Sequence, residues 1–172
     1  VSLIETLAED EAVEAKKIIE EMMLEHAGLS GIGLANANGD LVLTSDTLKH
    51  QVLINLKHKP ETKASFEEAL KSNHLIVGRT YFMPNTQEWV VPLRMSIRNH
   101  VDDVLGVMTV GLKLNSLESE WLGNSLPDNL RLLVLRKDLY RQYVSYAGPD
   151  SYEQWLANPL TEYMFKKTLD FI

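Results

Sequence analysis

The sequence predicts an α+β protein, in which a long N-terminal helix packs on a five-stranded antiparallel sheet and is followed by a helix and a smaller, partial second α+β module. Three observations lead to this prediction. Residues 2–26 repeat apolar side chains at intervals of three and four, residues 32–45 hold an Asn-Gly pair between two short apolar segments, and three segments typical of strands follow between residues 74 and 114.

The three strand-like segments are the centre of the prediction. Residues 74–83, 89–98 and 104–114 are rich in Val, Ile, Tyr, Phe, Trp and Thr, and runs of this length and composition favour strands over helices. The polar linkers between them are short enough for hairpins. We therefore expect an antiparallel meander that the rest of the chain covers or extends.

The N-terminal segment, residues 2–26, has the pattern of an amphipathic helix that ends at Gly28. We expect this helix to pack on the sheet. A helix of about 25 residues is nevertheless longer than one small sheet needs, so its first turns are also candidates for pairing with a second copy of the chain.

Two more strands are predicted at residues 32–37 and 40–45. Asn38 and Gly39 lie between them and form the strongest short-range signal for a hairpin, because a type I′ turn needs positive φ at both central residues. With the meander, this hairpin brings the predicted sheet to five strands.

The connection between the hairpin and the meander contains a long polar loop and a short helix. Loops as long as residues 46–60 usually bind something or are disordered in a compact domain. Residues 61–72 predict the helix, with Phe66, Ala69 and Leu70 on one face.

The C-terminal third repeats an earlier pattern. After a predicted helix at residues 114–123, residues 130–146 show the same order of strand, polar turn and strand as residues 32–45. Two interpretations stay open, the start of a second module and an ordinary extra hairpin. On the first, residues 1–122 form one module and residues 123–172 begin a second, incomplete one. The remaining predicted elements are helices at residues 151–157 and 160–172.

Composition excludes several classes of protein. The chain has 172 residues, of which 45% are hydrophobic, so it can bury a core. Its net charge of −7 without a basic patch argues against nucleic acid and anionic membrane surfaces as partners. The absence of Cys excludes thiol chemistry and disulfides but fits either redox compartment. Because the chain starts with Val1, we expect it to be a piece of a longer protein.

No motif in the sequence indicates catalysis or a cofactor. Patterns for a nucleophilic Ser, a phosphate-binding loop, a dinucleotide site or a zinc protease are missing. The five histidines show no spacing typical of metal ligands. We therefore expect no enzymatic activity, no metal and no cofactor, with His50 and His58 as the pair to examine first.

Strand alternation predicts a binding surface instead. Arg79 and Tyr81 fall on one face of their segment, Arg94 and Ser96 on one face of the next, and Thr109 on the last. If these faces coincide, the guanidinium groups could hold a small organic anion or an amino acid. The alternative is that both arginines pair with acidic residues at the sheet surface.

Trp89 opens the middle segment and completes the predicted ligand-binding set. It could line the cavity, although a large aromatic residue at the start of a strand is also typical of the core. Both roles stay open.

The order of elements and the wording of several segments resemble the Cache family of extracytoplasmic sensor domains, which have a PAS-like fold. The resemblance covers residues 1–122 and depends on residues 39–45, 65–70, 77–82, 89–94 and 105–112. One departure is that many members carry Gly in the turn before the last strand, where this chain has Asp102 and Asp103.

The resemblance implies a function. Cache domains are signal input domains of membrane-bound bacterial receptors, lie outside the cytoplasmic membrane and feed outputs such as a GGDEF diguanylate cyclase or a histidine kinase. The ligand would lie between the sheet and residues 46–59, and a homodimer would form through the N-terminal helix. Members that bind amino acids carry a Tyr, Arg and Trp signature that residues 61–72 lack, so the small-molecule ligand stays unidentified.

Two rival interpretations stay open. The first is a structural or dimerisation module whose pocket is closed by its own Phe82, Met95 and Met108. The second is a cytoplasmic PAS-like or GAF-like domain with a cofactor, which the absence of Cys and of an evident haem-binding His makes less attractive.

Overall fold

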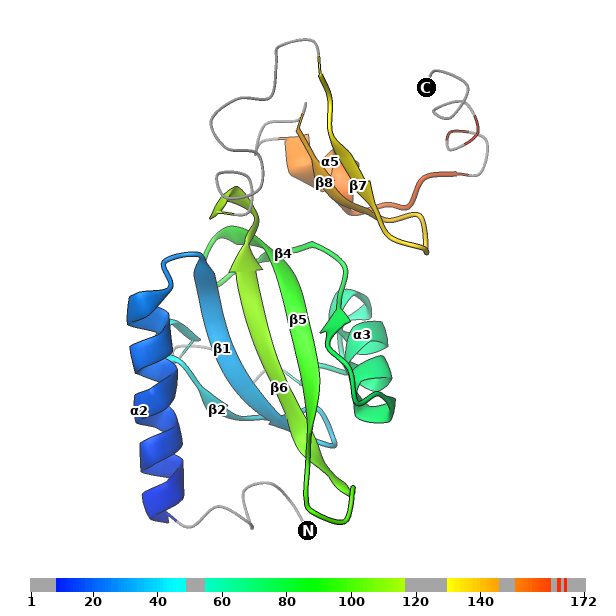
Figure 1. Cartoon of the computed structure of the whole chain (residues 1–172). Coiled ribbons are helices and arrows are strands. Elements are labelled where there is room, and N and C mark those ends of the chain that lie inside the picture. The colour runs from blue at the N-terminus through cyan, green and yellow to red at the C-terminus, as the bar shows by residue number, and fades with distance from the viewer. Residues whose placement is uncertain are drawn as a thin grey trace.

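The computed structural model describes residues 9–48, 55–116, 130–145, 151–161, 164 and 166. In this part of the chain, a twisted antiparallel sheet lies between two helices, and a hairpin with a short helix lies beyond one end of the sheet (Figure 1). The predicted α+β class is therefore confirmed.

The main sheet has the predicted meander at its centre. Its order is β2-β1-β6-β5-β3, with β4 also paired to β5, and every pairing is antiparallel. The strands are β1 (Leu29–Asn36), β2 (Leu41–Thr44), β3 (Ile76–Val77), β4 (Tyr81–Met83), β5 (Glu88–Arg98) and β6 (Val104–Lys113).

The third predicted strand is divided into β3 and β4, which is a correction to the single strand expected over residues 74–83. The intervening residues direct hydrogen bonds to the C-terminal hairpin. The Thr80 hydroxyl donates to the carbonyl of Gln142 at 2.7 Å, and the Gln142 side-chain amide donates to the carbonyl of Gly78 at 2.8 Å. Arg79 is consequently not part of a strand.

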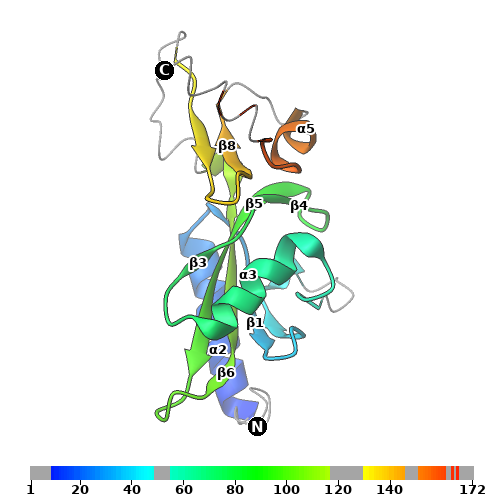
Figure 2. The ribbon, with the colours of Figure 1, turned by 90° about the vertical axis from the view of Figure 1, so that its right-hand side faces the viewer.

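The two helices cover opposite faces of the sheet, as the two views show (Figures 1 and 2). Helix α2 (Glu9–Glu25) packs on β1 and β2, and helix α3 (Pro60–Lys71) packs on β5 and β6. The first residues of the predicted N-terminal helix lie outside the described residues. Lys16 bonds Glu20 at 2.6 Å and Asp46 at 2.7 Å, which fastens α2 to the short helix η1 (Asp46–Leu48).

Helix α3 forms one core with the sheet. Pro60 stands at its first turn, where its missing N–H costs no hydrogen bond. The predicted apolar face is confirmed, because Phe66 and Ala69 are fully buried. The core cluster on this side comprises Ala35, Leu41, Leu56, Phe66, Ala69 and Val107.

The hairpin turn at Asn38 and Gly39 forms, but it is not the expected type I′ turn. Gly39 has a φ of 95°, whereas Asn38 does not have positive φ. The Asn36 carboxamide instead accepts from the amides of Asn38 and Asp40, which builds a three-residue loop. This use of the Asn36 side chain is the physical reason for the difference.

Two other turns repeat this loop with different residues. In each, the third loop residue has positive φ, 69° at Asp102 and 64° at Leu139. The matching backbone hydrogen bonds close both loops, from Asp102 to Asn99 and from Leu139 to Arg136. Asp102 therefore adopts a positive φ, which Gly takes more readily than other residues.

The C-terminal part contains the predicted second hairpin, β7 (Leu133–Leu135) and β8 (Arg141–Val144), and then helix α5 (Tyr152–Leu156). Much of the two flanking predicted helices, residues 114–123 and 160–172, lies outside the described residues. A shared apolar cluster joins the hairpin to the end of the main sheet. Its buried members are Val91, Leu114, Tyr143, Val144, Tyr152 and Leu156.

None of the helices in the described residues is both long and apolar enough to cross a membrane.

Candidate functional site

The face of the sheet beneath α3 carries four of the predicted site residues. Residues paired across neighbouring strands share a face, and alternate residues along one strand do so as well. Tyr81 pairs with Val90, Arg94 pairs with Thr109, and Ser96 follows Arg94 by two residues. The condition that these faces coincide is therefore met for these four residues, whereas Arg79 lies between β3 and β4. A role in binding stays a prediction.

Arg94 is the most unusual residue of this face. Its side chain is only 1% exposed, and one guanidinium nitrogen donates to the Ser65 hydroxyl of α3. The Nε and second terminal nitrogen have no hydrogen-bond partner in the described part of the chain. Burial lowers the pKa of Arg94 to about 10, against an opposing effect of Tyr81, so the group is still a cation at neutral pH.

Tyr81 lies close enough to Arg94 for the two groups to influence each other. Burial raises the pKa of Tyr81, Arg94 opposes this rise, and Glu61 adds to it. The phenol is therefore neutral at physiological pH and can donate a hydrogen bond to an anion beside the guanidinium group.

Gly78 keeps the surroundings of Arg94 close-packed. A Cβ at this position would lie 2.6 Å from Pro92, 2.7 Å from the Ser65 hydroxyl and 2.8 Å from the Arg94 Nη1.

We expect Gly78→Ala to lower the free energy of unfolding by about 1–3 kcal/mol, because the added methyl must displace the rigid Pro92 ring or Arg94. Gly111→Ala is the matched control, since a Cβ there has no neighbour closer than 3.6 Å, and its effect should be below about 1 kcal/mol. Urea unfolding measures both. Equal effects would show that the packing around Arg94 tolerates a methyl group.

A small pocket lies on the same face, beside Thr109 and a floor of Gly31, Gly33 and Gly111. Its volume is only about 60 Å³, because Leu48 covers the floor. The side chain of Leu48 lies within 2.8 Å of the position that a Cβ on Gly31 would take. An organic ligand fits here only if Leu48 moves.

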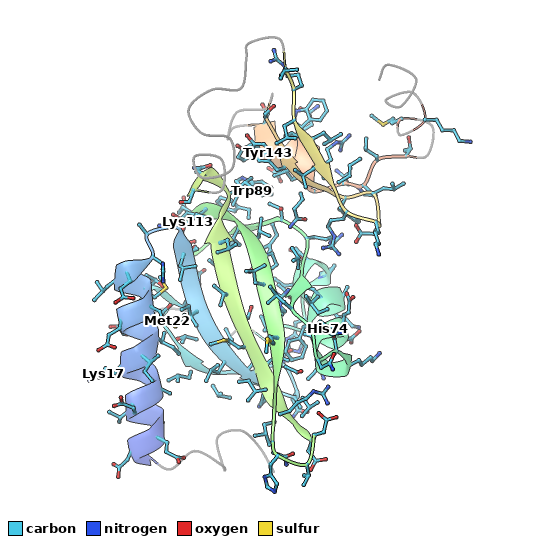
Figure 3. All side chains as sticks on the ribbon, in the orientation of Figure 1. Lys17, Met22, His74, Trp89, Lys113 and Tyr143 are labelled. Carbon is cyan, nitrogen blue, oxygen red and sulfur yellow. The ribbon has the colours of Figure 1, made fainter. Side chains whose placement is uncertain are left out.

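A much larger cavity, of about 560 Å³, lies between the end of the sheet and the C-terminal part. Arg79, Tyr81 and Trp89 line it, and Tyr81 also lines the small pocket. Trp89 reaches it from the end of β5 next to the C-terminal hairpin (Figure 3). The other lining residues are Pro60, Glu61, Thr80, Phe82, Tyr140, Glu153, Leu156 and Ala157.

The structure thus divides the predicted site residues among several places. Arg79, Tyr81 and Trp89 meet at the large cavity, Thr109 lines the small pocket, and Arg94 is buried behind Tyr81. Ser96 meets neither cavity: its hydroxyl donates to the carbonyl of Ser72 at 2.7 Å and accepts from Arg98 at 3.1 Å, which gives it a structural role.

Neither predicted arginine forms an ion pair with an acidic residue in the described part of the chain. Arg94 is buried beside Ser65 instead, and the Arg79 guanidinium lies 4.0 Å above the Tyr140 ring. In the rival interpretation of a structural module, Phe82, Met95 and Met108 would close the pocket. Phe82 and Met95 are 42% and 49% exposed, and they alternate to the face opposite Tyr81.

Sequence reasoning missed the partners that come from distant segments. Ser65, Glu61 and Tyr140 carried no local signal for a site, since a Ser within a helix, a Glu in a first helical turn and a Tyr in a hairpin are all ordinary. The described residues contain no cluster of three or more His, Asp or Glu side chains able to hold a metal ion, and His50 lies outside them.

No protein-family model and no curated protein sequence matches the chain. Solved structures of bacterial sensory domains, in contrast, share its fold. The Campylobacter jejuni chemoreceptor Tlp3 sensory domain with isoleucine bound gives a TM-score of 0.61 at 17% identity, over 99% of this chain and 64% of that chain. The ligand-binding domain of the Pseudomonas fluorescens chemoreceptor CtaA in complex with L-serine gives 0.62 at 15% identity, over 90% and 62%.

The sensor domain of the V. cholerae histidine kinase DctB has the fold as well, with a TM-score of 0.59 at 12% identity over 96% of this chain and 59% of that chain. The chain therefore spans less than two thirds of the length of these structures. The α+β fold predicted from the sequence is therefore also the fold of these sensory domains.

Proposed function

We propose that this chain is the extracytoplasmic small-molecule sensor domain of a membrane-bound bacterial signalling protein. Ligand binding shifts a dimer between two states and thereby regulates a cytoplasmic output such as a diguanylate cyclase or a histidine kinase. The likeness in fold to chemoreceptor and kinase sensor domains supports the proposal.

The observation that carries the proposal is the buried guanidinium of Arg94. A buried polar group without a partner costs free energy, and a buried charge costs more. Folded proteins keep such groups mainly where they have a use. A carboxylate or another small organic anion that reached Arg94 past Tyr81 would satisfy both unpaired nitrogens.

The dimer of this proposal would form through α2. Val13 and Leu24 of this helix are 69% and 86% exposed, and Ile18 is 49% exposed. Apolar side chains left on the outer surface of an amphipathic helix are suited to a second helix. The likenesses in fold to receptors that bind isoleucine or L-serine make amino acids sensible candidates for the ligand, alongside other carboxylates.

We expect a panel of mono- and dicarboxylates and amino acids to contain at least one compound that raises the Tm of the chain. At a hundred times its dissociation constant, a ligand stabilises the folded state by about 2.7 kcal/mol, or about 5–10 °C in Tm. A thermal-shift screen measures this, with uncharged sugars and polyols as the control compounds. A panel without any stabilising carboxylate would contradict the proposal.

A second candidate function is a structural module that binds nothing. It is favoured by Leu48, whose side chain fills most of the small pocket above Gly31. Leu48→Ala distinguishes the two. A module filled by its own side chain only loses stability with this change, whereas a sensor pocket gains room and should bind its carboxylate at least as tightly as before.

A further inference from the structure

We infer that the large cavity between the sheet and the C-terminal part is a second binding site, which takes an organic cation such as a quaternary amine. This inference concerns a different place and a different ligand class from the anion site at Arg94. Its volume of about 560 Å³ is within the range of small-molecule sites.

Aromatic rings form much of the wall of this cavity. Tyr81, Phe82 and Trp89 come from the sheet, and Tyr140 comes from the C-terminal hairpin. The rings of Phe82 and Trp89 lie 5.7 Å apart at an angle of 58°, so they form two sides of a corner. Several aromatic faces around one space are the usual environment for alkylated ammonium groups, which the negative ring faces attract.

One of these aromatic rings, that of Tyr140, already has a cation above it. The guanidinium of Arg79 lies 4.0 Å from the centre of the Tyr140 ring, a distance typical of a cation–π contact. Tyr140 is therefore occupied, and Trp89 with Phe82 is the pair of rings left for a ligand.

The charges of the cavity favour a cation over an anion. Glu61 and Glu153 line it together with Arg79, so the lining carries one net negative charge. No ion pair of either glutamate occurs within the described residues. Two carboxylates that outnumber the single guanidinium group, near aromatic rings, are complementary to a bound amine.

An adjoining groove is also lined by acidic side chains. It has a volume of about 350 Å³, shares Pro60, Glu61, Arg79 and Tyr140 with the cavity, and adds the carboxylates of Glu68 and Asp138. Asp138 is already paired with Arg136 at 3.1 Å. Glu68 therefore adds a further negative charge where a longer amine would extend.

Calorimetric titration of the chain with choline tests the inference. Choline should bind, whereas dimethylbutanol, its neutral isostere with carbon in place of nitrogen, should not. Glu61→Gln and Glu153→Gln should each weaken choline binding by roughly fivefold, the amount expected for one charge contact at a partly exposed site. Glu67→Gln, on the same helix but outside the cavity lining, is the matched control and should leave binding unchanged.

Several results would overturn the inference. They are no binding of choline at millimolar concentration, equal binding of choline and dimethylbutanol, and equal effects of the Glu61 and Glu67 variants. Sodium chloride at the same ionic strength controls for general attraction to a chain of net charge −7. An Arg94→Met variant should still bind choline, so failure of this site and failure of the anion site are distinguishable.

Discussion

Replacing Arg94 by Met should raise the free energy of unfolding of the ligand-free chain by about 1–4 kcal/mol, because it removes a buried charge and replaces it with an apolar side chain of similar length. The same variant should lose every rise in Tm that carboxylates cause in the wild type. A stability gain together with a loss of response is expected where a binding group is retained at a cost to the fold.

Arg98→Met is the matched control. Arg98 is on the same strand and face, but its guanidinium is satisfied by Ser96, the carbonyl of Asp102 and the carbonyl of Leu70. Its removal should therefore destabilise the chain, by about 1–3 kcal/mol. Urea unfolding of both variants measures the difference. If Arg94→Met destabilises the chain as Arg98→Met does, then Arg94 already has a stabilising partner and is not an anion site.

The free energies of unfolding of the wild type and of Arg94→Met should also differ in their dependence on pH. Burial lowers the pKa of Arg94 to about 10 in the folded chain, well below the ordinary value of a guanidinium group. Above pH 10 the unfolded chain holds the proton that the folded chain releases, so the wild type gains stability with rising pH relative to the variant. The advantage of Arg94→Met should therefore be full at pH 7 and smaller at pH 11.

The sequence was sufficient for the fold because its signals are local. Strand alternation over residues 89–98 and 104–113, the helix period before Gly28 and the Phe66 face of α3 each depend on neighbours along the chain. The break between β3 and β4 could not be predicted from the sequence. That break depends on Gln142, more than sixty residues away, which takes the hydrogen bonds of Gly78 and Thr80.

The candidate site was predictable only in part for the same reason. Alternation gave the face of each residue only within its own strand, and it is the register that brings Tyr81, Arg94 and Thr109 to one face. Alternation predicts the face on which a side chain lies but not how deeply it is buried. It therefore could not distinguish Arg94, which is buried with two nitrogens that lack a partner, from Ser96, whose hydroxyl donates to the carbonyl of Ser72. Nor could it bring Tyr140 or Glu153 to the large cavity, because these residues reach it only through the docking of the C-terminal hairpin.

The docking of the C-terminal hairpin on the main sheet leads to the second prediction with a large expected effect on stability. Tyr152 is 2% exposed, and its ring meets the edge of Trp89 at 6.0 Å. We expect Tyr152→Ala to lower the free energy of unfolding by about 3–5 kcal/mol, as for other buried aromatic residues. Leu130→Ala is the control, since Leu130 is 50% exposed and should change stability by less than about 0.5 kcal/mol.

Hydrogen exchange then shows how far the loss spreads. The apolar cluster combines Val91 and Leu114 at the end of the main sheet with Tyr143 and Leu156 of the C-terminal part, so this cluster is complete only when the two parts are docked. Tyr152→Ala should therefore reduce protection in β5 and β6 as well as in β8. If protection falls in β8 alone, the predicted boundary near residue 123 separates two units that unfold independently, and a ligand at the sheet has no rigid connection to the hairpin.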